Sequence, residues 1–103
     1  MSGAVLTIVN ARVDPAHEAE LVTGFENLTA TSLPDGLMRT ELLRGQNGSW
    51  RIETLWRDRA ALEAVRTGPE PPAATELFRR LGADHSHEVF VVESAHRPGA
   101  PDT

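Results

Sequence analysis

The Asn47-Gly48 pair constrains the fold of this chain more than any other feature of its sequence. It lies between two segments of alternating polarity, residues 37–44 and 50–57. Asn-Gly readily adopts the left-handed backbone of a tight turn whose twist matches that of paired antiparallel strands. These two segments are therefore predicted to form a β-hairpin in the middle of the chain.

The segment before the hairpin predicts a strand followed by a helix. Residues 5–13 are rich in β-branched side chains and have apolar residues on both faces, which is typical of a central strand. Asp14 can cap a helix whose first residue is Pro15. The apolar residues that follow recur on one helical face, and the helix is expected to continue to about Leu33.

The segment after the hairpin predicts two short helices and a last strand. Asp58 is suited to cap a helix that ends at the Gly-Pro pair at 68–69. The prolines at 71–72 can begin a second helix, which Gly82 would end. Residues 88–94 then predict the final strand.

The resulting order, β-α-β-β-α-β with a broken second helix, indicates an α+β fold of the ferredoxin-like type with a four-stranded antiparallel sheet. The length of 103 residues suits one domain, expected at 1–96, followed by a flexible tail at 97–103. Helices on one face of the sheet would leave apolar strand residues such as Val9 or Val91 uncovered. A second copy of the chain is expected to cover them, which predicts a homodimer.

Composition and charge limit the partners and the compartment that can be expected for this chain. The net charge is −5 and the arginines are scattered, which argues against nucleic acid or an anionic membrane as a partner. No apolar stretch is long enough to span a bilayer, and the N-terminus does not resemble a signal peptide. Together with the absence of cysteine, these features make the cytoplasm the expected compartment.

The absence of cysteine excludes thiol chemistry, and the chain also lacks the lysine needed for a Schiff base and the tyrosine needed for tyrosyl acid–base chemistry. It has no glycine-rich dinucleotide or phosphate motif, so no cofactor is expected. His85 and His87 lie two residues apart in the expected loop before the last strand. Without a third ligand they predict no metal site, and one of them could act as a general base or simply face water.

Five segments together resemble the antibiotic biosynthesis monooxygenase domain, and the resemblance extends over residues 4–94. It is carried by residues 9–15, 18–25, 33–37, 41–44 and 53–64, of which the strand-ending Trp56 before a capped helix is the most specific. The resemblance implies a dimeric α+β barrel with one pocket per subunit between sheet and helices. Family members include cofactor-independent oxygenases of aromatic polyketides, quinol oxygenases and haem-degrading enzymes.

Trp56 and Asn10 are the leading candidates for the site. Trp56 shares one face of its strand with Trp50, Ile52 and Thr54. It could pack against a helix, or it could form a pocket wall that stacks on a flat ligand or donates its N–H to one. The amide of Asn10 is unusual in an apolar strand and needs hydrogen-bond partners, either from neighbouring residues or from a ligand.

The resemblance supports these candidates and also shows departures. Polyketide oxygenases and haem degraders carry a Trp at the place of Trp56, and haem degraders carry an Asn at the place of Asn10. Haem degraders also need a histidine after the Gly-Pro break, and residues 70–81 contain none. The anthrone oxygenases have an Asn where this chain has Ile52, and a Tyr where it has Leu62.

The sequence therefore predicts a cofactor-independent monooxygenase that uses O₂ on a small aromatic substrate, such as an aromatic polyketide, an anthrone or a quinol. Alternatives are a non-catalytic binding or pathway-accessory protein on the same fold and a divergent haem binder. A His or an Arg would serve as the charge partner of the substrate. The expected catalytic residues are Asn10, Trp56 and His87, and the expected substrate-binding residues are Trp50, Ile52, Phe25, Leu62, Phe78 and Arg79.

Overall fold

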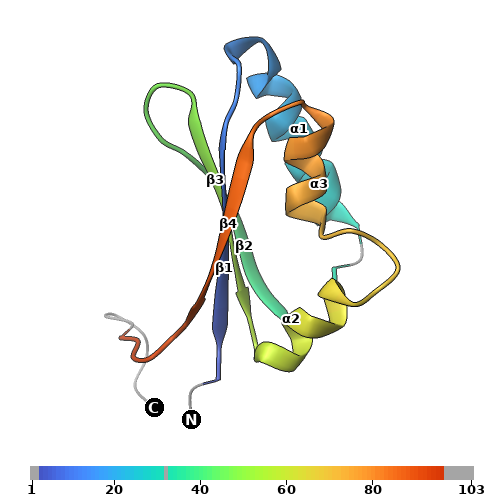
Figure 1. The fold of residues 1–103 in the computed structure, drawn as a ribbon, viewed down its shortest axis with the longest axis vertical. Coiled ribbons are helices and arrows are strands. Elements are labelled where there is room, and N and C mark those ends of the chain that lie inside the picture. The colour runs from blue at the N-terminus through green and yellow to red at the C-terminus, as the bar shows by residue number, and fades with distance from the viewer. Residues whose placement is uncertain (1–2, 32, 97–103) are drawn as a thin grey trace.

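The computed structural model describes residues 3–31 and 33–96, so the tail expected at 97–103 lies outside the described residues. Four strands form one antiparallel sheet in the order β2-β3-β1-β4, and the helices cover one of its faces (Figure 1). This arrangement confirms the predicted ferredoxin-like α+β fold. The strands are β1 (Val5–Arg12), β2 (Leu37–Arg44), β3 (Ser49–Trp56) and β4 (His85–Val91).

The helices begin where the sequence predicts. A 3₁₀ turn, η1 (Pro15–His17), leads into α1 (Glu18–Ala30), and the Asp14 carboxylate accepts a hydrogen bond from the Ala16 N–H at 2.8 Å. After the hairpin come α2 (Arg59–Arg66) and α3 (Ala73–Arg80), the two halves of the broken second helix. The carboxylate of Asp58 caps α2 by accepting from the Ala61 N–H at 2.9 Å.

The predicted hairpin forms at the Asn-Gly pair. Asn47 and Gly48 have φ angles of 57° and 78°, the left-handed conformation that this turn requires. The Gly45 N–H donates to the carbonyl of Ser49 at 2.8 Å and closes the loop. Because the hairpin sets the register of β2 against β3, it also fixes which of their side chains lie side by side.

The last strand begins three residues earlier than predicted, at His85 instead of Glu88. It pairs with β1 from Ala11↔His85 to Val5↔Val91. An edge strand is held by backbone hydrogen bonds and has less of its surface covered, so its polar beginning does not prevent pairing. His85 and His87 consequently lie on β4 and not in the loop before it.

The core lies between the sheet and the helices. Its larger cluster joins β1, β3, α1 and α3 around Leu21, Trp50 and Phe78. The smaller cluster packs Val5 and Trp56 against α2. No helix within residues 3–31 and 33–96 is long and apolar enough to cross a membrane.

The two residues expected on the uncovered face lie instead on the helix-facing side of the sheet. Val9 is buried in the larger cluster, and Val91 pairs with the buried Val5 at the exposed end of β4. Side chains alternate along a strand, so Leu6 and its neighbours Leu55 and Phe90 point to the opposite, open face. The open face therefore does carry apolar residues, but they are not the ones that the sequence indicated.

Candidate functional site

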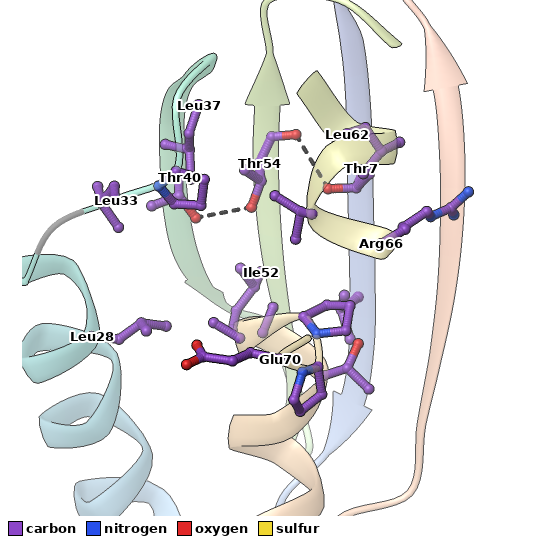
Figure 2. A pocket seen from close by; sticks show the side chains of 18 of the residues that line it. Thr7, Leu28, Leu33, Leu37, Thr40, Ile52, Thr54, Leu62, Arg66 and Glu70 are labelled. Atoms are coloured by element: carbon purple, nitrogen blue, oxygen red, sulfur yellow. Dashed lines mark hydrogen bonds between the residues drawn. The ribbon is translucent and has the colours of Figure 1, made fainter. Parts of the chain in front are cut away.

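A pocket of about 770 Å³ lies between the helix-facing side of the sheet and the helices (Figure 2). Strands β1, β2 and β3 form its floor. The second half of α1 and the turn after it form one wall, and α2, residues 68–72 and the start of α3 form the other. A concave, mainly apolar site of this size suits a small flat ligand.

Three threonines cross the floor of the pocket in one row. Thr40 on β2 pairs in register with Thr54 on β3, and Thr54 pairs in register with Thr7 on β1. All three line the pocket, and they are defined here as the threonine row (Figure 2). The next row along the floor contains Ile52 and Val9, and His87 on β4 extends this row to the edge of the pocket.

The walls are mainly apolar and partly rigid. Phe25 and Leu28 contribute from α1, and Leu62 and Val65 from α2. In the segment 68–72, three of the five residues are prolines, which have a fixed φ and no backbone N–H. This wall therefore offers few backbone donors to a ligand.

Trp56 both packs in the core and forms part of the pocket wall. Its indole N–H donates to the hydroxyl of Thr7 at 3.0 Å, and that hydroxyl donates to the carbonyl of Thr54 at 3.4 Å. Trp56 as a whole is 6% exposed, and it packs in the smaller core cluster with residues of α2. Because the indole N–H already donates a hydrogen bond to Thr7, it is not free to donate to a ligand. The ring can still stack against a ligand.

The edge of the pocket carries ionisable groups. His87 on β4 is exposed and lines the pocket, next to Val9 in the register. Arg66 lies in the last turn of α2 and forms an ion pair with Glu63 at 3.4 Å. Glu70 extends from the segment between α2 and α3 toward α1 (Figure 2). A histidine, an arginine and a glutamate thus border a cavity that is otherwise lined by apolar residues and threonines.

The turn that carries Leu33 and Pro34 into the pocket is tied to the end of β3. The Arg57 N–H donates to the carbonyl of Gly36 at 2.7 Å, and the Arg57 guanidinium bonds Asp35 and Asp58. The hydrogen bond that the Arg57 guanidinium donates to Asp35 is the main reason why the pKa of Arg57 is raised, with Asp58 adding to it. These contacts fix the position of the pocket wall next to α1.

Five of the residues predicted for the site come together in this pocket. Trp56, Ile52, Phe25, Leu62 and His87 all line it. Within the part of the chain that the structure describes, no three His, Cys, Asp or Glu side chains group as metal ligands.

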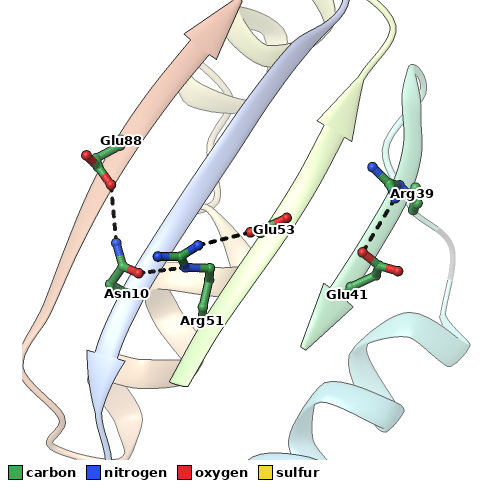
Figure 3. A network of polar contacts seen from close by, with 6 residues as sticks. All are labelled: Asn10, Arg39, Glu41, Arg51, Glu53 and Glu88. Atoms are coloured by element: carbon green, nitrogen blue, oxygen red, sulfur yellow. Dashed lines mark hydrogen bonds and ion pairs between the residues drawn. The ribbon is translucent and has the colours of Figure 1, made fainter. Parts of the chain in front are cut away.

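Asn10 lies on the opposite face of the sheet from Trp56, so the two predicted partners are not brought together. Its amide oxygen accepts from the Arg51 Nε–H at 2.9 Å, and its amide nitrogen donates to Glu88 at 3.4 Å (Figure 3). Arg51 in turn bonds Glu53 at 3.2 Å. Neighbouring side chains therefore satisfy the amide, and the sheet separates it from the pocket.

Three further predicted binding residues lie outside the pocket. Trp50 is buried beyond its end, where its N–H donates to Glu18 at 3.2 Å and the Arg44 guanidinium lies 4.7 Å from its ring centroid. Phe78 is fully buried in the larger core cluster. Arg79 is exposed and pairs with Glu76 on its own helix. In the structure, Trp50 and Phe78 are core residues and Arg79 is a surface residue.

The sequence interpretation missed Thr7, Thr40 and Arg66. Threonine is common in strands, so its presence gave no signal. Thr54 had been placed on the face of Trp56, but only the register shows that two further hydroxyls lie beside it. Arg66 lies in the last turn of a helix, where the helix dipole favours a cation in any protein, so its position did not indicate a role in a site.

An antiparallel sheet covered on one face by helices, with a pocket between the two layers, is typical of small ligand-binding α+β proteins. The chain belongs to the antibiotic biosynthesis monooxygenase family, whose model matches residues 4–77. At the level of the family, the function is of monooxygenase type. No curated protein matches the chain.

Solved structures agree with this assignment. The chain is 26% identical to a variant of SnoaB, a cofactor-independent oxygenase from Streptomyces nogalater, with a TM-score of 0.73 over 91% of this chain and 97% of that one. A protein from Deinococcus radiodurans shares the fold at 17% identity and a TM-score of 0.73, over 93% and 99% of the two chains. Rv0793 from Mycobacterium tuberculosis shares it at 18% identity and 0.69, over 92% and 100%.

Proposed function

We propose that this protein is a cofactor-independent monooxygenase that acts in the cytoplasm on an aromatic polyketide, an anthrone or a quinol. The observation that carries the proposal is the apolar pocket, walled by Trp56 and bordered by the ionisable His87. Such a pocket can hold a flat aromatic compound and place a base beside it. The likeness to SnoaB supports the absence of a cofactor from the reaction.

The chemistry follows from the substrate's own reactivity. His87 takes a proton from the methylene carbon of an anthrone, and the electron-rich anion that results transfers an electron to O₂. Overall, anthrone and O₂ give anthraquinone and water. One oxygen atom becomes the new carbonyl, and the other leaves as water with the two methylene hydrogens.

Arg66 takes the part of the charge partner in this proposal, in place of Arg79. Arg66 is one of the residues that line the pocket, whereas Arg79 is not. A cation beside an apolar cavity stabilises a developing anion more strongly than it would in water. Asn10 has no part in the reaction as proposed, because it lies across the sheet.

Oxygen uptake with 1,8-dihydroxyanthrone tests the proposal against the uncatalysed oxidation rate. His87→Gln is expected to lower kcat by about a hundredfold, a typical contribution of a general base. His85→Gln is the matched control on the same face of the same strand, since His85 bonds the carbonyl of Ala83 and does not line the pocket. Oxygen uptake no faster than the uncatalysed rate, or equal rates for His87→Gln and the unaltered protein, would overturn the assignment.

One observation favours a non-catalytic binding protein as the second candidate. Ile52 and Leu62 both line the pocket, and both are hydrocarbon side chains that can neither donate nor accept a proton. A binding or pathway-accessory protein would retain the anthrone without consuming O₂. The same oxygen electrode experiment, combined with a binding measurement, distinguishes the two candidates.

For the open face of the sheet, the proposed partner is a second copy of this chain. Leu6, Leu55 and Phe90 lie side by side there, and Phe90 is 48% exposed. Phe90→Asp is expected to give a monomer in sedimentation equilibrium. Val91→Asp is the matched control, because Val91 is 49% exposed but points to the other face. A chain that is monomeric before any substitution refutes this partner.

A further inference from the structure

The threonine row contains the hydroxyl groups of the pocket floor, and its members differ in how their protons are used. The Thr7 hydroxyl accepts a hydrogen bond from the indole N–H of Trp56 and donates one to the backbone carbonyl of Thr54. It has one proton and therefore nothing left to donate. The Thr7 hydroxyl therefore orients the indole ring of Trp56 and is not a donor to the ligand.

The other two hydroxyls have a proton to spare. The oxygen atoms of Thr40 and Thr54 lie 3.0 Å apart, and either can be the donor of the bond between them. Two hydroxyls carry two protons, and a single mutual bond uses one. Among residues 3–31 and 33–96, no third group bonds either side-chain oxygen. Whichever hydroxyl accepts, its own proton remains uncommitted.

That proton lies in apolar surroundings. Thr54 is 7% exposed, and Leu37, Ile52 and Trp56 from the neighbouring rows also face the pocket. A donor that is removed from water gains most from a ligand oxygen, because no solvent competes for it. A site with such a donor discriminates against ligands that lack the matching acceptor.

We propose that the Thr40–Thr54 pair binds a carbonyl or phenolate oxygen of the ligand and sets its orientation in the pocket. This inference rests on the proposed function, because it takes the pocket to hold an anthrone-like ligand. The pair and His87 are on opposite sides of β1 in the sheet. The oxygen of the ligand would thus point to β2 and β3, and the reacting carbon to β4.

The spacing of the strands agrees with this orientation. Thr54 and His87 are two strands and one side-chain step apart, about 12 Å between their backbones, and the long imidazole covers part of that distance. A hydrogen bond of about 2.8 Å, the central ring of an anthrone and a proton-transfer contact of about 3 Å together extend about 10 Å. An anthrone bound to the threonine pair therefore presents its methylene carbon to His87.

Binding measurements with two ligands test the pair without requiring turnover. Anthrone has a carbonyl oxygen, and 9,10-dihydroanthracene has the same tricyclic carbon skeleton without it. The affinity ratio of the two, measured by quenching of tryptophan fluorescence, isolates the contribution of that oxygen. We expect the unaltered protein to prefer anthrone by about three- to tenfold.

The double variant Thr40→Val/Thr54→Val is expected to reduce this preference to about one, because it has no hydroxyl proton to donate. Each single valine variant should keep part of the preference, since the remaining hydroxyl is then free. Thr40→Ser/Thr54→Ser is the control for packing: it removes the two threonine methyl groups, keeps both hydroxyls and should keep the preference. A loss in the serine variant as large as in the valine variant would mean a packing effect and would overturn the proposal.

The remaining outcomes separate this inference from the proposed function. If the double valine variant keeps the preference for anthrone, the pair is not the binding group, while oxygen uptake by the unaltered protein would still support the monooxygenase. If the unaltered protein binds neither ligand, the proposed function fails and the inference fails with it.

Discussion

Replacing Thr7 by valine removes the oxygen that accepts the indole proton of Trp56 while keeping nearly the same side-chain shape. Trp56 as a whole is 6% exposed, so water cannot easily take the place of that oxygen. A buried donor left without a partner costs about 1–3 kcal/mol, and the free energy of unfolding should fall by about that amount. With a urea dependence of about 1–3 kcal/mol per molar, the midpoint should fall by about 1 M.

A double-mutant cycle shows whether this cost comes from the Thr7–Trp56 bond. In the background of Trp56→Phe there is no indole proton to satisfy, so Thr7→Val should then cost little. The coupling between the two positions is expected to be about 1–2 kcal/mol. All variants are compared at one protein concentration, because any self-association would add to the apparent stability. Additive losses, or a loss from Thr7→Ser equal to that from Thr7→Val, would refute the reasoning.

Substitutions at three further positions test the fold by urea unfolding. Gly36→Ala should cost about 2 kcal/mol or more, since φ is +87° and the new Cβ would clash with the Cβ of Ala61; full stability would contradict the turn. Asp58→Ala should cost about 1 kcal/mol by removing the cap of α2, whereas Asp58→Asn should cost less. Phe78→Ala should cost about 3–5 kcal/mol, and a loss below 1 kcal/mol would be inconsistent with its burial.

Local signals predicted most of the fold. The Asn47-Gly48 turn and the caps at Asp14 and Asp58 act within a few residues, so they can be identified without knowing the rest of the structure. The last strand was misplaced because the polarity of an edge strand says little about where it begins. Its limits are set by the length of β1, to which it is hydrogen-bonded.

The site was harder to predict because the sequence does not distinguish the two faces of β1. Val5 and Val9 alternate with Leu6 and Ile8, so both faces are apolar and the side of Asn10 could not be assigned. On β3 the polarity differs between faces, and there the face of Trp56 was identified correctly. The threonine row depends on the register between three strands, which no single segment of the sequence contains.

The sequence also does not distinguish residues that line the pocket from residues that pack in the core. Trp50 and Trp56 lie on the same face of one strand, yet only Trp56 borders the cavity. What separates them is the position of the helices above the sheet. α3 packs over the end of the sheet where Trp50 lies, whereas residues 68–72 leave a space over the other part.

The proline-containing wall at 68–72 separates selectivity for the size and flatness of a ligand from selectivity for its polar groups. Three of its five residues lack an N–H, so the wall determines mainly how large and how flat a bound molecule can be. In the binding mode proposed above, the polar features of that molecule are recognised across the cavity, by the threonine pair on β2 and β3. Changes of loop length between α2 and α3 could therefore enlarge the range of ring systems accepted, while the oxygen pattern required of them stays the same.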